Sequence, residues 1–431
     1  MIEASPQTLD ASAEATIAFL RDVFSDLPRD FAVRLWDGTV WEPDSGAAPR
    51  FTLVLRHPGA VRAMFWPPGE LSLAEAYLYD DYDVEGDLEA VFPVADELIE
   101  RGVSIGHRLR RMRRLHALPS ERRPRVGRQA AELRGRRSSL ERDRQAVGYH
   151  YNLSNEFFAL WLDPTMAYSC AVFASADEEL ATAQRRKLDY VCRKLRLEAG
   201  ERLLDVGCGW GGLVLHAVQE FGVEALGVTL SSAQVALASS RISDAGLDDW
   251  CRVELRDYRE IGEPASFDKI ASVGMYEHVA RDALTDYFRH VHSLLRPGGV
   301  FLAHGIAASA SAPPSNGQTF LNTYVFPDHD LVPISTLLVS AEEAGFEVRD
   351  VESLREHYVL TTRKWLARLE ARHDEACRLT DEVAYRIWRL TLAASAHRFA
   401  SGRANLYQVL LAKPDARGAT GLPLSRADWY A

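Results

Sequence analysis

The feature that most constrains this chain is a glycine-rich turn between an expected strand and an expected helix. Residues 203–206 form a short, mostly apolar run, and a second apolar run follows at residues 213–218. Gly207, Gly209 and Gly211 lie between them. Glycine has no Cβ atom, so such a turn lets backbone amides approach a ligand closely. A strand, a glycine turn and a helix open a nucleotide-binding βαβ unit.

The glycine spacing and the neighbouring elements indicate which class of ligand the turn binds. The Gly-x-Gly-x-Gly spacing suits an adenosine without a pyrophosphate better than a dinucleotide. Asp205 ends the first strand, residues 223–229 predict a second strand, and residues 230–234 open a second helix. A tight glycine turn alone is common in α/β proteins. With these neighbours it resembles the S-adenosylmethionine (SAM) site of class I methyltransferases.

Length and composition predict a water-soluble chain of two domains. The 431 residues are 47% apolar and 26% charged, and no apolar run approaches the ~18 residues that span a bilayer. The first residues lack the pattern of a secretory signal. Five scattered cysteines, never in C-x-x-C spacing, argue against disulfides and against a zinc site. We therefore expect a cytoplasmic protein without a metal.

The N-terminal part of the chain predicts a small α+β domain over residues 1–100. Helical apolar spacing at residues 15–27 precedes a strand at Phe51–Leu55, and another apolar helix is expected near residues 91–98. No group of catalytic residues is recognisable there, so a packing or docking role is the simplest interpretation.

Residues 101–145 form an arginine-rich segment. It holds fifteen arginines and four acidic residues, a local charge of +11 in a chain whose net charge is −11. A solvated surface does not require this imbalance, which leaves nucleic acid or an anionic membrane as the partner. No other part of the chain resembles a nucleic-acid module. We therefore expect a linker that faces the inner surface of the membrane, and no nucleic acid.

Beyond residue 148, several motifs follow one another in a characteristic order. They are Tyr149-His-Tyr-Asn-Leu-Ser-Asn155, Pro164-Thr-Met-Ala-Tyr-Ser-Cys170, Phe267-Asp-Lys-Ile-Ala-Ser-Val-Gly-Met-Tyr-Glu-His278, Leu294-Leu-Arg-Pro-Gly-Gly299 and Tyr324-Val-Phe-Pro327. Over residues 148–413 the chain resembles the cyclopropane-fatty-acyl-phospholipid synthases and the mycolic acid cyclopropane synthases. The resemblance implies a class I SAM-dependent methyltransferase domain, Rossmann-like, over residues 146–414, with a mostly parallel seven-stranded sheet. The tail, residues 415–431, is expected to be poorly packed.

The resemblance also implies a set of residues that hold SAM. Tyr168 and Ser169 would lie over the methionine end, the glycine turn beneath it, and Asp257 near the adenine. The full set is Tyr168, Ser169, Asp205, Gly207, Cys208, Gly209, Trp210, Gly211, Thr229, Leu230, Ser231, Gln234 and Asp257. For Thr229 and Ser231, helix capping explains the residue type nearly as well as ligand contact does.

A second implied set surrounds a bound bicarbonate ion that serves as the catalytic base. It comprises Cys170, Glu277, His304, Ile306 and Tyr358, of which Ile306 would act through its backbone. Taken singly, the cysteine, the histidine and the tyrosine have ordinary explanations as core residues. Aromatic residues such as Tyr276 and Phe326 would either stabilise a cation or fill the core.

The implied reaction moves the SAM methyl carbon to the cis double bond of an unsaturated acyl chain on a membrane phospholipid. The resulting carbocation loses a proton and becomes either a cyclopropane or a methylene branch. Two rival hypotheses are a methyltransferase of a soluble small molecule and a catalytically silent lipid-binding protein. Both a monomer and a homodimer are compatible with the sequence.

One departure from the common family pattern bears on the product. Asp328-His-Asp-Leu-Val-Pro333 resembles a variant frequent in actinobacterial members that we associate with methylene- and 10-methyl-branched, tuberculostearate-type acids. His329 stands where that variant has glycine. Both products therefore stay open, and a methylene product would need a separate reductase.

Overall fold

The computed structural model describes residues 10–25, 27–100, 105–136, 139–151, 153–310 and 319–430. They divide into two units. The first holds the residues up to Gln129 and, from much later in the chain, Asp381–His397. The second runs from Ala130 and contains most of the remaining chain. Each unit is described by itself.

The first unit is built on a four-stranded sheet. Its strands are β1 (Ala32–Arg34), β2 (Val40–Trp41), β3 (Phe51–Leu55) and β4 (Tyr82–Gly86), in the order β2-β1-β3-β4. Only β1 and β3 run parallel. The helices are α1 (Ala11–Val23), α2 (Ala60–Phe65), α3 (Glu70–Leu78), α4 (Val91–Glu100) and α5 (Ile105–Ala117). Helix α5 packs against α1 and α2.

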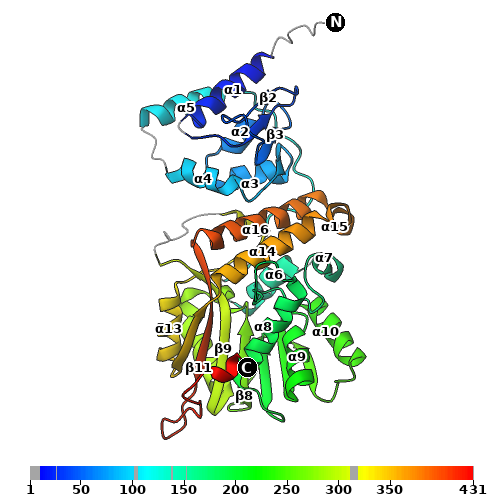
Figure 1. Cartoon of the computed structure of the whole chain (residues 1–431), viewed down its shortest axis with the longest axis vertical. Helices are drawn as coiled ribbons and strands as arrows, with labels where there is room; N and C mark the ends of the chain where they lie inside the picture. The colour runs from blue at the N-terminus through cyan, green and yellow to red at the C-terminus, as the bar shows by residue number, and fades with distance from the viewer. Residues whose placement is uncertain are drawn as a thin grey trace. The chain divides into compact units, whose positions relative to one another are not determined.

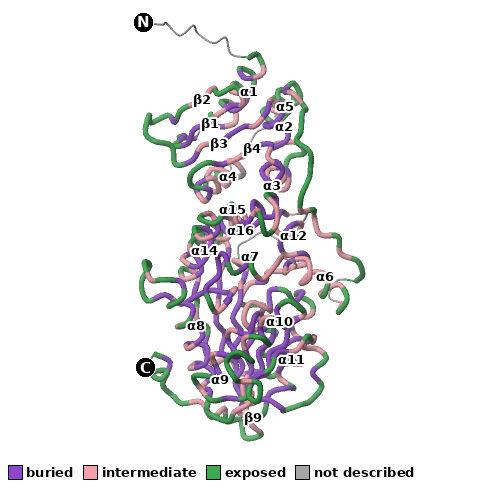
Figure 2. The backbone as a smooth tube through the Cα atoms, turned by 90° about the vertical axis from the view of Figure 1, so that its right-hand side faces the viewer, coloured by how far each residue is buried: buried purple, intermediate pink, exposed green. Residues whose placement is uncertain are grey.

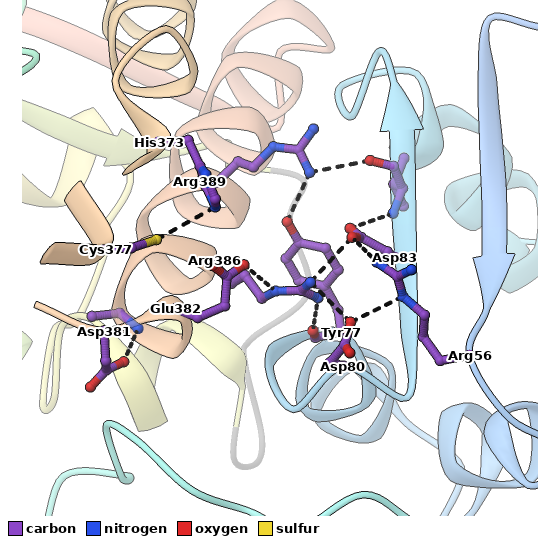
Figure 3. A network of polar contacts seen from close by, with 12 residues as sticks. Arg56, Tyr77, Asp80, Asp83, His373, Cys377, Asp381, Glu382, Arg386 and Arg389 are labelled. Atoms are coloured by element: carbon purple, nitrogen blue, oxygen red, sulfur yellow. Dashed lines mark hydrogen bonds and ion pairs between the residues drawn. The ribbon is translucent and has the colours of Figure 1, made fainter. Parts of the chain in front are cut away.

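A buried arginine attaches a distant helix to this sheet. Most of α16 (Glu382–Ala400) belongs to the first unit. Arg386 is 6% exposed, and its guanidinium contacts the carboxylates of Asp80 and Asp83 at 3.0 and 3.1 Å (Figure 3). It also donates a 2.8 Å hydrogen bond to the backbone oxygen of Tyr77. A buried guanidinium needs such partners, because an unpaired buried charge is costly.

The second unit is built on a seven-stranded sheet in the order β10-β11-β9-β8-β5-β6-β7. Figure 1 labels β8, β9 and β11 of this sheet. The strands are β5 (Arg202–Val206), β6 (Glu224–Thr229), β7 (Cys251–Leu255), β8 (Phe267–Val273), β9 (Leu295–Ala308), β10 (Glu347–Ser353) and β11 (Ala404–Ala412). β11 runs antiparallel to both of its neighbours, and the other pairings are parallel. This confirms the predicted mixed α/β fold with a mostly parallel seven-stranded sheet.

Two apolar cores lie on opposite faces of this sheet. One is formed with α8 (Leu180–Leu195), α9 (Gly212–Phe221) and α10 (Ser232–Asp244), and the other with α11 (Leu284–Leu294) and α13 (Ile334–Glu343). Figure 2 shows buried backbone running through the middle of this unit. The further helices are α6 (Leu140–Tyr151), α7 (Asn155–Ala159), α12 (Phe320–Tyr324), α14 (Arg355–Glu370) and α15 (His373–Leu379).

The expectation of a poorly packed tail is wrong for its end, although most residues from Ala416 to Arg426 are exposed. Trp429, in the short 3-10 helix Ala427–Trp429, is 4% exposed and joins the core beneath α8 and α9. Asp428 pairs with Arg196, and the hydroxyl of Tyr190 donates to that of Tyr430. A single tryptophan supplies enough apolar surface to fix a short tail. The tail is otherwise rich in glycine and charged residues, so its composition alone does not predict this packing.

Within the described residues, no helix combines the length and the apolar character that a bilayer span requires.

Candidate active site

The glycine turn lies between β5 and α9, at the carboxyl end of β5, which pairs with β6 and β8. Gly207, Gly209 and Gly211 have φ values of +79°, +54° and +79°, which favour glycine strongly. A Cβ atom on Gly211 would also lie 3.1 Å from that of Ala238. The turn therefore keeps bare backbone at the switch point of the sheet, where α/β proteins bind their ligands.

Asp205 supplies a buried polar group beside this turn. It is 2% exposed, burial raises the pKa of its carboxyl to about 7, and nearby Lys187 acts in the opposite direction. Within the described part of the chain, Oδ1 of Asp205 has no hydrogen-bond partner. A buried oxygen left in this state is suited to accept a hydrogen bond from a ligand.

Lys187 on α8 supports the loop that carries Tyr168 and Ser169. Its side chain is buried, and its ammonium donates a 2.7 Å hydrogen bond to the Ser169 hydroxyl. Burial lowers the pKa of Lys187 to about 8, while nearby acidic groups counteract the shift. Gln184, one turn earlier, donates to the backbone oxygen of Ser169 at 2.8 Å.

Thr229, Ser231 and Gln234, which the resemblance implies in contact with the SAM ribose, bond to one another or to nearby backbone. Ser231 caps α10, because its hydroxyl accepts from the backbone N–H of Gln234 at 3.3 Å. The Thr229 hydroxyl donates to the side-chain oxygen of Gln234 at 2.5 Å. Leu230, between Thr229 and Ser231, is half-buried. The capping explanation therefore describes Ser231 correctly, and ligand contact by this group stays a prediction.

Asp257, expected near the adenine, lies just after β7 and is 2% exposed. Its carboxylate oxygens accept hydrogen bonds of 2.8 and 2.7 Å from the Arg259 guanidinium, and it forms a capping box with Glu260. A ligand that bonds to this carboxylate would share it with Arg259.

Aromatic rings gather between the glycine turn and the other predicted site residues. Tyr168 lies 5.4 Å from Trp161 and 5.3 Å from Trp365, measured between ring centroids. Trp210 of the turn lies 5.9 Å from Tyr151 and donates a 2.7 Å hydrogen bond to Asn155. The other turn side chain, Cys208, is buried beneath the turn. Faces of aromatic rings stabilise cations, worth up to ~2 kcal/mol in a desolvated site.

Glu277 is placed by a sharp turn after β8. Gly274 has φ +73°, and the 3-10 helix Tyr276–His278 follows. Glu277 is 8% exposed, and burial raises the pKa of its carboxyl to about 7. Hydrogen bonds from the backbone amides of Glu277 and Ile306 act in the opposite direction and lower this pKa. Its Oε2 has no partner within the described residues. A Cβ atom on Gly305 would lie 2.5 Å from that oxygen, so only glycine fits there.

The Tyr358 phenol lies within electrostatic reach of this carboxyl and of the Cys170 thiol. Burial raises the pKa of the Tyr358 phenol well above its ordinary value, and Cys170 and Glu277 raise it further. Burial likewise raises the pKa of the Cys170 thiol. Tyr358, on α14, packs against Phe399 with 4.5 Å between ring centroids. The thiol and the phenol are therefore both protonated and can donate hydrogen bonds.

His304 is fully buried on β9, next to Gly305. The Gln408 side-chain amide donates to Nδ1 of His304 at 3.1 Å, which places the histidine proton on Nε2. Burial keeps the pKa of His304 well below its ordinary value, so the ring is neutral. Its Nε2 has no partner among the described residues. Of the predicted catalytic set, the backbone N–H of Ile306 bonds to the Glu277 carboxyl, whereas the charged groups that act on the His304 ring are Lys187 and Lys194.

Residues 328–333, the segment that differs from the common family pattern, contact the turn that carries Glu277. The backbone N–H of Asp330 donates to the backbone oxygen of Glu277 at 3.3 Å, and Asp330 accepts from the Arg281 N–H at 3.2 Å. Asp328, with φ +67°, pairs with Arg142. The pKa of His278 is lowered to about 4, mainly by burial and to a lesser extent by the nearby His329.

The comparisons with known proteins agree with this geometry. Residues 138–409 match the family described as mycolic acid cyclopropane synthetase. The chain belongs to this family. Residues 18–100 match a separate domain of unknown function.

Similar proteins cover both the whole chain and its second unit. A probable fatty acid methyltransferase of Pseudomonas putida is 39% identical over 96% of this chain and 100% of its own. The tuberculostearic acid methyltransferase UfaA1 of Mycobacterium tuberculosis is 35% identical (63% and 65% covered). The cyclopropane-fatty-acyl-phospholipid synthase of Escherichia coli K12 is 36% identical (61% and 66% covered).

A solved structure supports the same assignment. The mycolic acid cyclopropane synthase CmaA1, complexed with SAH and CTAB, superposes with a TM-score of 0.59 at 33% identity, covering 62% of this chain and 97% of that one. This protein is accordingly a SAM-dependent methyltransferase that modifies fatty acyl chains, and the resemblance inferred from the motifs is confirmed.

Two buried residues and one half-buried tyrosine near the site were not predicted. They are Lys187, Tyr151 and Trp365. Lys187 and Tyr151 lie in segments that match the family, but a lysine on a helix is ordinarily read as exposed. Trp365 has no local signal, because its role depends on the packing of α14 against Trp161 and Tyr168.

Proposed function

We propose that this enzyme methylates the cis double bond of unsaturated acyl chains carried on membrane phospholipids, with SAM as donor and bicarbonate as base. The observation that carries the proposal is the buried Glu277 carboxyl, whose Oε2 has no partner among the described residues and which lies within electrostatic reach of Tyr168 and Tyr358. An acyl-chain pocket without chemistry has no use for such a group, since burying a carboxyl is costly.

The first step needs positioning and exclusion of water. An isolated alkene is a weak nucleophile, so it must lie in line with the methyl group of the donor. The bare glycine turn and Asp205 would hold the donor, and the rings of Tyr168, Tyr151 and Trp365 would enclose the alkene. Transfer forms a bond from one alkene carbon to the methyl carbon and leaves a cation on the other. The same rings would stabilise that cation.

The second step removes a proton from the new methyl group. If the electron pair of that C–H bond closes onto the cationic carbon, the product is a cyclopropane. If a hydride first shifts from the methyl-bearing carbon to the cation, the same proton loss gives a methylene branch. Both routes need a base at the same place.

The residues around Glu277 fit a small bound anion that carries one proton. Bicarbonate, when bound, supplies the base. Oε2 of Glu277 would accept its hydrogen bond, and the Nε2–H of His304, the Cys170 thiol and the Tyr358 phenol would donate to its oxygens. The backbone N–H of Ile306 holds the Glu277 carboxyl in position.

In this proposal, the contact between residues 328–333 and the Glu277 turn determines which of the two products forms. Asp330 bonds to the backbone of Glu277, so this segment influences where the carboxyl and the base lie. Methylene and cyclopropane products remain the two candidates, and a methylene product implies a separate reductase. The enzyme would act at the inner face of the membrane, as a monomer or a homodimer.

Label transfer from methyl-labelled SAM tests the proposal. Vesicles containing oleoyl phospholipids are incubated with the protein, and lipid and aqueous fractions are counted separately. We expect label in the lipid acyl chains. Label confined to soluble acceptors, or none at all with vesicle binding intact, would contradict the proposal. Proton NMR of the labelled acyl chains then distinguishes high-field cyclopropane hydrogens from olefinic methylene hydrogens.

A further inference from the structure

Helix α5 carries an exposed apolar pair. Leu109 is 53% and Met112 is 40% exposed, and their spacing of three residues places them on the same side of the helix. Leu115, at 5% exposure, lies on the side that packs into the first unit. An exposed apolar pair on an otherwise basic helix is not needed for the packing of α5.

The arginines of α5 divide into two groups. Arg111 and Arg114 pair with Asp22 of α1, at 3.2 and 3.6 Å, and hold the helix in place. A second group is exposed and has no acidic partner among the residues that the structure describes. It comprises Arg108, Arg110 and Arg113.

The positions of these unpaired arginines relate directly to the apolar pair. At 100° per residue, Arg108 and Arg113 lie on either side of Leu109 and Met112, and Arg110 lies further around the helix. An apolar strip bordered by arginines is the pattern of helices that lie in a membrane interface.

Arginines later in the segment serve a different purpose. Arg123 pairs with Asp80, Arg125 with Glu75, and Arg142 with Asp328. Part of the local charge that the sequence shows is therefore neutralised within the chain. Of the exposed arginines without an acidic partner among the described residues, three lie together on α5, and the others are Arg122, Arg134 and Arg136.

We propose that the exposed face of α5, formed by Leu109, Met112, Arg108, Arg110 and Arg113, docks on an anionic phospholipid surface. The arginines bind lipid phosphates, and Leu109 and Met112 enter the acyl boundary. A nucleic acid would also attract the arginines, but it would leave the apolar pair in water. The need for such a surface rests on the proposed function, since that substrate lies within a bilayer.

Two variants separate the charged and the apolar contributions. Binding to vesicles of phosphatidylglycerol and phosphatidylcholine is measured by co-sedimentation at low and high salt. R108Q/R110Q/R113Q should bind about a hundredfold more weakly at low salt, with a smaller difference at high salt. L109S/M112S should bind roughly tenfold more weakly at both, because apolar burial is not screened.

Matched controls come from the second unit. V339S/L379S changes side chains that are 53% and 39% exposed, and R185Q/R378Q/R417Q removes three exposed arginines. Both should bind like the wild type. Equal binding by L109S/M112S and its control, or by the two arginine variants, would overturn the proposal.

A gain of signal provides a second measurement. The tryptophan fluorescence of Met112→Trp should be quenched by vesicles whose acyl chains are brominated, and that of Val339→Trp should not; no added quenching at Met112→Trp would overturn the proposal.

Turnover in detergent micelles is measured in parallel. The α5 variants should keep it, whereas absence of methyl transfer by the wild type would contradict the proposed function and leave the docking result standing.

Discussion

At the scale of single residues, Glu277 is the group on which the proposed chemistry depends. Glu277→Gln keeps the size of the side chain but removes its charge, so it should lower kcat by ~10²–10⁴-fold, the range of acid–base participation. The SAM dissociation constant, measured by calorimetry, should be nearly unchanged. In the wild type, kcat should rise as the pH passes through about 7, the raised pKa of this carboxyl. Parallel loss of SAM binding would make Glu277 a cofactor or structural residue.

The same carboxyl makes a prediction about stability. Its pKa is raised from 4.5 to about 7 by burial, so the folded protein disfavours its charge. The resulting penalty is absent below pH 4.5, grows as the pH rises through 7, and reaches about 3 kcal/mol. Glu277→Gln should therefore be more stable, relative to the wild type, at pH 8.5 than at pH 5. Urea unfolding at both pH values checks this, and an unchanged difference would refute the assigned pKa.

Gly305 is required by its neighbours and not by its backbone angle. A Cβ atom would lie 2.5 Å from both Glu277 and Tyr276, so Gly305→Ala should displace the carboxyl and cost ~1–3 kcal/mol of stability. Gly262, with nothing within 4 Å of its would-be Cβ, is the control. Unfolding and turnover of both variants are compared. Gly305→Ala behaving like Gly262→Ala would show that the Glu277 pocket is looser than described.

At the scale of elements, the sequence predicted those strands and helix ends that depend on residues close together in the chain. The strand before the glycine turn, the strand at Phe51–Leu55 and the capping serine of α10 all follow from residue types at short range. The assignment of Asp381–His397 to the first unit does not. It depends on Arg386 meeting Asp80 and Asp83, three hundred residues away, and no periodicity encodes that meeting.

The same limit applies to the site. The resemblance implied Cys170, Glu277 and Tyr358, and the structure brings the Tyr358 phenol within electrostatic reach of the other two. They did not reveal that Asp257 is already paired with Arg259, or that Lys187 is buried. Side chains far apart in the chain settle both, so only the fold could show them.

The C-terminal tail gives the clearest test at this scale. Trp429→Ala should destabilise the protein by ~3–5 kcal/mol, because a buried indole leaves a large cavity. Leu424, fully exposed in the same tail, should tolerate alanine within ~0.5 kcal/mol. Denaturant unfolding of the two variants measures the difference. Equal stabilities would mean that the tail is as loosely held as its composition suggests.

At the scale of the whole molecule, the chain combines a methyltransferase unit with a first unit that presents a basic, partly apolar helix. The seven-stranded sheet, the site and most of the family match lie in the second unit, although Asp381–His397, within the matched residues, belongs to the first. The first unit contributes α5, on which Arg108, Arg110 and Arg113 are exposed and have no acidic partner among the described residues.

The central claim is that the transferred methyl group itself loses the proton. The most direct test uses SAM with a fully deuterated methyl group, vesicles of oleoyl phospholipids and mass spectrometry of the released acyl chains. The account predicts that two of the three deuterons are retained, whether the product is a cyclopropane or a methylene branch. Retention of all three would show that the proton comes from elsewhere, and would contradict the account.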